Sequence, residues 1–184
     1  TGGANQVVAG STVKLDASGG SIGDLAAPVN TQTAQLSLAT GGNLAVANRQ
    51  ALTSLDITSR HAQPGVNNSF LLTSPDLAFA LQDNGGYQLN TVNQSALHFS
   101  FTGDRTITVG DVALGTGTLA LTSTAGNIYG TAGGLLNANQ VTLSAAGSDG
   151  RNGAIGSSAQ ALRMQTVGLT ATSGTGGVYV NGLG

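Results

Sequence analysis

The acidic residues come first, because paired carboxylates supply the acid, base or nucleophile in many polysaccharide-cleaving enzymes. All eight are aspartates, and they are spread along the 184 residues: Asp16, Asp24, Asp56, Asp76, Asp83, Asp104, Asp111 and Asp149. Opposite charges come close in the sequence within 104–105 and 149–151, two stretches rich in glycine. Turns of this composition normally lie at the surface. We therefore expect these residues at solvated corners, and the sequence predicts no catalytic residue.

The two histidines give no pattern for a metal site or a catalytic triad. His61 lies in a stretch that leads to Pro64 and Gly65, a composition typical of a loop. His98 alternates with Leu97 and Phe99, so it should point outward from a strand. The chain has no cysteine, which excludes disulfides, zinc–thiolate sites and cysteine nucleophiles. We expect both histidines at the surface, and we predict no metal and no cofactor.

Two tyrosines are the candidates for contact with a ligand. Tyr129 follows an inward Ile128, and Tyr179 lies between Val178 and Val180, so both rings should face outward. An exposed tyrosine can stack on a sugar ring while its hydroxyl forms a hydrogen bond. Isolated surface tyrosines without any function remain the alternative interpretation.

A short apolar-x-apolar motif recurs through the whole chain and sets the framework for these residues. Its first positions are 13, 36, 55, 77, 97, 119, 141 and 167, so the spacing varies from 19 to 26 with a mean of 22. Alternation with a period of two is the signature of a strand with one buried face. Repeats of this length are typical of solenoids, in which each repeat buries its apolar face against its neighbours.

The repeat predicts an all-β fold, a right-handed parallel β-helix of about eight coils with about 22 residues in each. Residues 1–184 should form a single β-helical segment. One inward column is expected from one residue of each motif: Leu15, Leu38, Ile57, Phe79, Phe99, Leu121, Leu143 and Leu169. Extra residues in 61–69 and 147–153 should protrude as flexible turns. An antiparallel sandwich or barrel would explain short strands but not a motif in constant frame.

Composition excludes several classes of protein. Only 8% of residues are charged, the formal net charge is −2, and 29 residues are glycine. No basic block is present to neutralise phosphates, so we predict no binding to nucleic acid. No run approaches 18 apolar residues, so no membrane-spanning segment is expected.

With this repeat, the chain resembles the filamentous-haemagglutinin-like exoproteins of bacterial two-partner secretion. The resemblance lies in the period, the Leu-x-Leu strands and the Gly-x-Ile-Gly corners at 20–23 and 153–156. It implies the structural and adhesive shaft of a secreted or cell-surface protein of a Gram-negative-type bacterium, acting in attachment, aggregation or biofilm. It also implies export through an outer-membrane transporter and partners among host or matrix glycans or proteins. The family's Asn-Pro-Asn-Gly-type motif is absent, so an interior fragment of a longer adhesin is expected, and not an enzyme.

Two other functions remain open, a carbohydrate-binding module and a fragment of a polysaccharide-active β-helix enzyme. The terminal segments carry a further expectation. Residues 1–11 and 177–181 have no charge and would leave strand edges unpaired. Such edges are templates for pairing, so end-to-end self-association is expected.

Overall fold

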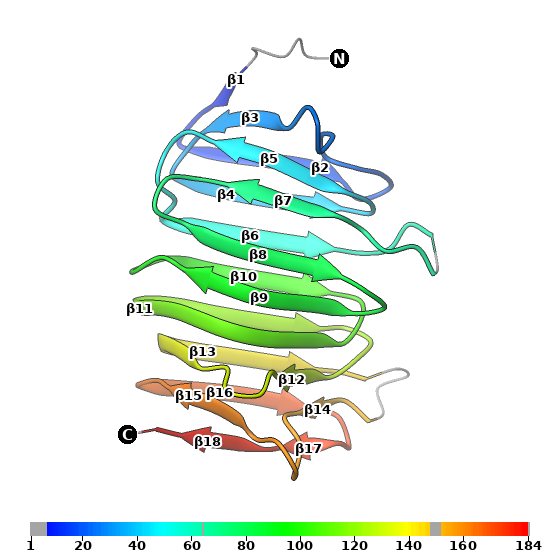
Figure 1. Cartoon of the computed structure of the whole chain (residues 1–184), viewed down its shortest axis with the longest axis vertical. Coiled ribbons are helices and arrows are strands. Elements are labelled where there is room, and N and C mark those ends of the chain that lie inside the picture. The colour runs from blue at the N-terminus through cyan, green and yellow to red at the C-terminus, as the bar shows by residue number, and fades with distance from the viewer. Residues whose placement is uncertain (1–6, 64, 148–151, 184) are drawn as a thin grey trace.

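The computed structural model describes residues 7–63, 65–147 and 152–183 (Figure 1). These residues form an all-β structure, as the sequence predicts, and eighteen strands lie within the described ranges. The strands are β1 (Val7–Ala9), β2 (Thr12–Ala17), β3 (Val29–Gln32), β4 (Gln35–Thr40), β5 (Leu44–Asn48), β6 (Ser54–Ser59), β7 (Phe70–Thr73), β8 (Ala78–Asp83), β9 (Tyr87–Asn93), β10 (His98–Gly103), β11 (Ile107–Ser123), β12 (Ile128–Gly130), β13 (Leu136–Ala145), β14 (Ala154–Ile155), β15 (Leu162–Gln165), β16 (Gly168–Ser173), β17 (Gly177–Val178) and β18 (Val180–Gly182). Within the described ranges, no apolar helix long enough to cross a membrane is found.

The first wall of the stack is a continuous parallel sheet built from the repeated motif. In order, β2, β4, β6, β10, the second half of β11, the second half of β13 and β16 pair side by side (Figure 1). Most of these segments are six residues long and carry an alternating pattern of buried and exposed side chains. Parallel neighbours require a crossover through another part of the molecule, which the intervening segments provide. The prediction of stacked parallel strands is therefore confirmed.

The second wall consists of those intervening segments. Its upper part is the parallel sheet β1-β3-β5-β7. Its lower part continues from β9 through the first half of β11 to β12 and β13, and then to β14, β15, β17 and β18. The long strand β11 turns a corner and so belongs to both walls (Figure 1).

An apolar column fills the space between the walls. Leu38, Ile57 and Leu121 are at most 1% exposed, and they lie in one register with Leu143. The second wall contributes further buried side chains, among them Ile107. Because each strand alone cannot bury its inward face, the strands are stable only as a stack.

The register of two predicted column residues is wrong by two positions. Phe99 pairs with Leu55 and Leu119, and it is Phe101 that lies beside Ile57 and Leu121. Alternation continues over three apolar residues in this strand, and a shift of two leaves the same face inward. The pattern therefore fixes the facing of the strand but not its register.

The last motif shows the same shift. Leu169 pairs with Val141, so Ala171 takes the position beside Leu143. Leu169 is 39% exposed, and Val167 lies ahead of β16 and is 84% exposed. The motif at 167–169 therefore does not place a residue in the buried column.

The fourth motif does not join the first wall at all. β6 pairs directly with β10, whereas β8 pairs antiparallel with β9 in the second wall, with Phe79 opposite Val92. The reason lies in two short turns, 74–77 and 84–86, where Asp76 and Gly85 both have φ near +70°. Turns this short reverse the chain and cannot carry it to the opposite wall. Residues 54–98 therefore advance the first wall by one strand and insert a β7-β8-β9 meander into the second.

The two flexible turns predicted from sequence have different outcomes. The predicted turn at 147–153 lies largely outside the described residues, as do Asp149 and Arg151. The segment that follows β6 is fastened to the body of the protein by the side chain of His61. Its prediction as a freely protruding loop is wrong for this part of the segment.

Candidate functional site

Three corners of the stack meet beside the inserted meander, and each brings a titratable side chain. His61 follows β6, Asp83 ends β8, and Asp104 follows β10. Pairing of β6 with β10 places the first and third of these corners next to each other. The meander brings the second corner between them, together with Tyr87 at the start of β9.

The imidazole of His61 lies between two carboxylates. Its Nε2 is 2.6 Å from Oδ2 of Asp83, and its Nδ1 is 2.7 Å from Oδ1 of Asp104. The His61 side chain is only 5% exposed. An ionised carboxylate only accepts hydrogen bonds, so both ring nitrogens donate when both carboxyl groups are ionised. The geometry thus suits an imidazolium held between two anions.

Asp83 is the most deeply buried member, with a fully covered side chain. Besides the His61 ring, its carboxylate accepts hydrogen bonds from Nη1 of Arg105 at 3.1 Å and from the backbone N–H of Asn68 at 2.8 Å. A buried carboxylate is tolerated when it is paired and hydrogen-bonded in this way. Arg105 is the cationic partner of this carboxylate, and the His61 ring and the Asn68 N–H lie within hydrogen-bond distance of its other oxygen.

Tyr87 and Asp104 complete the cluster. The Tyr87 hydroxyl lies 2.7 Å from Oδ1 of Asp104 and 3.1 Å from the carbonyl oxygen of Ser59. Burial raises the pKa of Tyr87 well above its ordinary value, and the neighbouring Asp104 carboxylate adds to this, so the hydroxyl stays neutral. Partial burial acts to raise the pKa of Asp104, but hydrogen bonds from the His61 backbone, Tyr87 and the His61 ring lower it below its usual range.

The connections within this cluster limit the chemistry it can do. A general base needs a free lone pair within reach of a substrate proton. Both nitrogens of His61 face carboxylates and Oδ1 of Asp104 has two partners, the His61 ring and Tyr87, while Oδ2 accepts one hydrogen bond, from the His61 backbone, and keeps a second lone pair. No group of three or more His, Cys, Asp or Glu side chains within the described ranges is placed to hold a metal ion. The arrangement therefore suits a clamp that ties the His61 segment to the stack.

The cluster corrects three expectations. His61 was expected at the surface and is buried, and Asp104 and Arg105, expected as solvated corner residues, are 29% and 18% exposed. Sequence reasoning also treated Asp83 as one scattered acid among eight. A usable signal was present, because 61, 83 and 104 are separated by about one repeat. Stacking of β6 on β10 brings His61 and Asp104 to the same corner of adjacent layers, whereas Asp83 reaches it through the β8–β9 hairpin.

His98 lies where the alternation predicts. It is exposed on the outer face of β10, and its Nδ1 is 2.9 Å from the hydroxyl of Thr118 on the next strand. This contact is an ordinary cross-strand hydrogen bond between neighbouring layers.

Tyr129 and Tyr179 lie on the second wall, far along the chain from the cluster. Ile128, Ile155 and Val178 share one register, which places the two tyrosines in one row with Gly156 between them. Tyr179 is 40% exposed and Tyr129 is partly exposed. Val178, expected to face inward, is also 40% exposed. A ligand contact by the two tyrosines stays a prediction.

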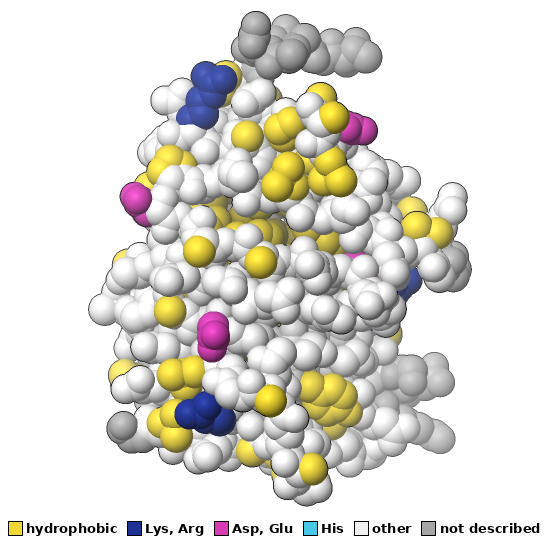
Figure 2. Space-filling view, viewed as in Figure 1, with side chains coloured by type: hydrophobic (Ala, Val, Ile, Leu, Met, Phe, Trp, Pro, Cys, Tyr) yellow, Lys and Arg dark blue, Asp and Glu magenta, His cyan; other side chains and the backbone are white. Residues whose placement is uncertain are grey.

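A second surface feature is the seam between β7 and β8, which are joined only by the isolated bridge between Ser69 and Gln82. A groove of about 460 Å³ opens there, with Leu72, Leu77 and Phe79 among its lining residues. Figure 2 shows apolar side chains in a recess at this level of the molecule. The meander is thus packed less regularly than the layers above and below it.

Comparisons with protein-family models, curated proteins and solved structures find no match to this chain.

Proposed function

We propose that this chain is a length of the shaft of a secreted bacterial adhesin, built as a right-handed parallel β-helix. The observation that supports this most is the first wall, in which seven strands of the repeated motif pair in parallel from β2 to β16. A stack of this kind can be lengthened layer by layer without a change of design. That property suits a spacer that holds a binding surface away from a cell.

The proposal places the protein outside the cell, secreted or at the surface of a Gram-negative-type bacterium after export through an outer-membrane transporter. The absence of cysteine favours such a route, because an unfolded chain in transit has nothing to cross-link. Attachment, aggregation or biofilm formation would then depend on host or matrix glycans or proteins. The chain would act without enzymatic turnover.

The test is an in-frame deletion of residues 7–183 from the full gene product in its native bacterium. Surface display is measured with an antibody to a part outside the deletion, and attachment and aggregation are measured in parallel. The proposal expects display to be kept and attachment or aggregation to fall. Unchanged attachment and aggregation at equal display would contradict it, as would finding the intact protein inside the cell.

A carbohydrate-binding module is the second candidate, because Tyr129 and Tyr179 lie in one outward row with a glycine between them. Replacement of both tyrosines by alanine should abolish any glycan-array signal that depends on this row. A signal that survives the double replacement would exclude this surface as the binding site.

A fragment of a polysaccharide-cleaving enzyme is the third possibility, and the His61 cluster is the gathering of titratable side chains within the described residues that could contribute to it. We propose that the cluster does not act in this way, since its acceptor atoms are engaged with one another. Incubation of the chain with acidic and neutral polysaccharides should leave their length distribution unchanged. Shortened chains that disappear with His61→Ala would revive the enzymatic function.

A further inference from the structure

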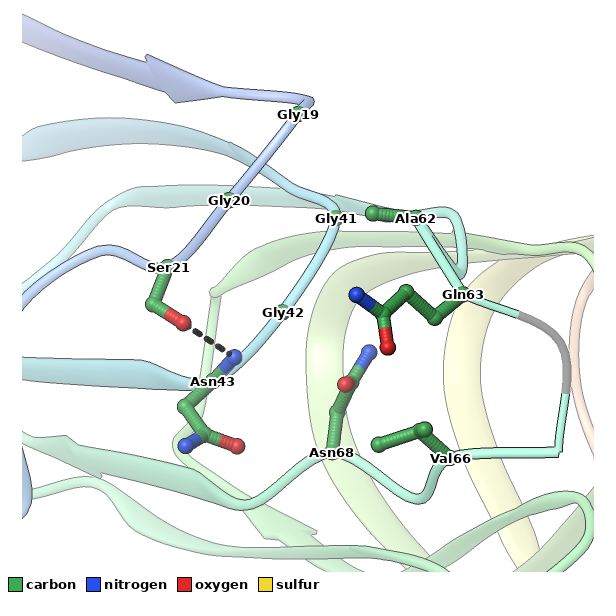
Figure 3. Close-up of a pocket in the computed structure, with 10 residues that line it drawn as sticks. All are labelled: Gly19, Gly20, Ser21, Gly41, Gly42, Asn43, Ala62, Gln63, Val66 and Asn68. Atoms are coloured by element: carbon green, nitrogen blue, oxygen red, sulfur yellow. Dashed lines mark hydrogen bonds between the residues drawn. The ribbon is translucent and has the colours of Figure 1, made fainter.

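A groove on the edge of the upper layers is built differently from the rest of the surface. It lies where the chain leaves β2 and β4, and the segment after β6 closes its other side (Figure 3). Its volume is about 230 Å³. That is below the usual 300–1,000 Å³ of a small-molecule site, so the space suits a ligand of about one ring.

The floor of the groove is backbone. Gly19 and Gly20 have open space where a side chain would begin. At Gly41 and Gly42 a side chain would collide with Ser18 and Ser21 of the layer above. A ligand can therefore approach the main chain closely along this floor.

One wall of the groove presents an amide with no partner. The Asn68 side chain is 6% exposed, and its Nδ2 is buried without a hydrogen-bond partner among the described residues. Figure 3 shows this amide pointing towards Gln63 and the groove. The backbone N–H of Asn68 is fixed by Asp83 at 2.8 Å, so the amide is held in place by the buried cluster.

Buried polar groups are almost always hydrogen-bonded, and each exception requires an explanation. A ligand that supplies an acceptor to Asn68 provides one. Gln63 is exposed and lies over this amide in Figure 3, and because Nδ2 of Asn68 is itself buried, the Gln63 side chain has to turn aside before a ligand can reach it. On the opposite side, Ser21 accepts a hydrogen bond from the backbone N–H of Asn43 at 2.9 Å, which leaves the Ser21 hydroxyl proton available to a ligand.

The lining selects a class of ligand. It contains amides, a hydroxyl and two apolar side chains, Ala62 and Val66, but no charged side chain. An anion would find no cationic partner, and a metal ion would find no carboxylate. A purely apolar ligand would leave Asn68 unpaired.

We propose that this groove binds a neutral saccharide, one pyranose ring at a time, with Asn68 donating to a ring or hydroxyl oxygen. The sugar's hydroxyl groups meet the amides and the glycine backbone, and its apolar face lies against Val66. This site is separate from the Tyr129 and Tyr179 row, and it does not depend on the proposed role as an adhesin shaft.

The test uses the whole 184-residue chain and four neutral sugars: glucose, galactose, mannose and N-acetylglucosamine. Binding is followed by ligand-observed NMR and by titration up to tens of millimolar. Gly20→Val should fill the groove without a clash, because its added Cβ meets nothing within 4 Å. Gly182→Val is the matched control, because it also has open space and lies outside the groove.

Asn68→Leu separates ligand binding from folding. Removing an unpaired buried amide should leave thermal stability equal or higher, while sugar binding should fall at least tenfold. We expect at least one sugar to bind and to lose affinity with Gly20→Val and Asn68→Leu but not with Gly182→Val. Binding of none of the four sugars, or binding that all three variants retain, would overturn the proposal. Because this measurement is made on purified protein, its outcome is independent of the deletion experiment on attachment.

Discussion

The two walls of the stack are built from the same chain but follow different rules. In the first wall the strands keep one direction, and a sequence period of about 22 residues describes it except where the β7-β8-β9 meander is inserted and where the register shifts by two residues. In the second wall, β8 runs against β9, and a buried charged cluster lies at its edge. Apolar alternation decides the facing of a strand, whereas turn length decides which wall it enters. The regular wall is therefore held by burial, and the irregular one also by charge pairing.

The largest effect is expected where charge pairing replaces apolar packing. Asp83→Ala should lower the free energy of unfolding by about 3–5 kcal/mol, because it leaves Arg105 and His61 without their buried partner. The measurement is the denaturant midpoint at pH 7. Asp56→Ala, on the outer face of β6, is the matched control and should change the midpoint little. Equal midpoints for the two variants would show that the cluster contributes nothing to stability.

Phe79 and Phe99 look equivalent in the sequence but lie in different walls, so replacing each of them compares the two walls directly. Phe99→Ala should cost about 3–5 kcal/mol, since Phe99 is 1% exposed in the first wall. Phe79 is only partly buried on β8, and its ring packs edge-on against that of Phe99 with 6.1 Å between the ring centroids. Phe79→Ala should therefore lower the free energy of unfolding by clearly less. Chemical denaturation of both variants measures the difference. A larger loss for Phe79→Ala would mean that β8 belongs to the regular stack.

Acid should weaken the cluster through Asp104. The pKa of Asp104 is lowered in the folded protein. Its contribution to the free energy of unfolding is therefore fully present above the unfolded-state pKa of about 3.9, and it is lost as the pH falls through the lower folded-state pKa. Asp104→Asn should cost about 1–3 kcal/mol at pH 7, the range for a hydrogen bond to a charged group. The difference in free energy of unfolding between wild type and Asp104→Asn should become smaller as the pH is lowered from 7 to 3. The exposed Asp16→Asn is the control, for which we expect no narrowing. A gap of constant size would argue against this linkage.

The sequence predicts the first wall well, because the alternation of residues such as Leu36 and Leu38 reports directly on burial. It does not predict the shift at Phe99, since a slip of two residues leaves alternation unchanged. It also misses β8, because the same apolar alternation serves a parallel coil and an antiparallel meander. The groove at Asn68 depends on how three separate segments meet, which no local pattern records.

The His61 cluster was predictable in part. His61 and Asp104 each follow a strand of the repeated motif, and such residues gather at one corner of the stack. Their burial was not predictable in the same way, because charged residues in glycine-rich turns are usually solvated. It is the hairpin formed by β8 and β9 that brings Asp83 over this corner and excludes water.

The smallest expected effect is on local opening at Arg60. Three successive backbone N–H groups, of Arg60, His61 and Ala62, donate to Thr40, to Asp104 and to Gly41. A protease must release all three before it can bind the chain, so cleavage reports the free energy of local opening. This differs from the flexible turn that the sequence predicts at 61–69.

Trypsin should therefore cleave wild type slowly after Arg60, and Asp104→Asn should accelerate this cut. A loss of about 1–3 kcal/mol in the clamp corresponds to an increase of roughly five- to hundredfold in the cleavage rate. Arg163 in β15 lies in a different part of the stack and serves as the internal reference, since its cleavage should not change. Mass spectrometry of early fragments distinguishes the two cuts. Rapid cleavage after Arg60 in the wild type, or equal acceleration at both sites in the variant, would show that His61 and Asp104 do not hold this segment in solution.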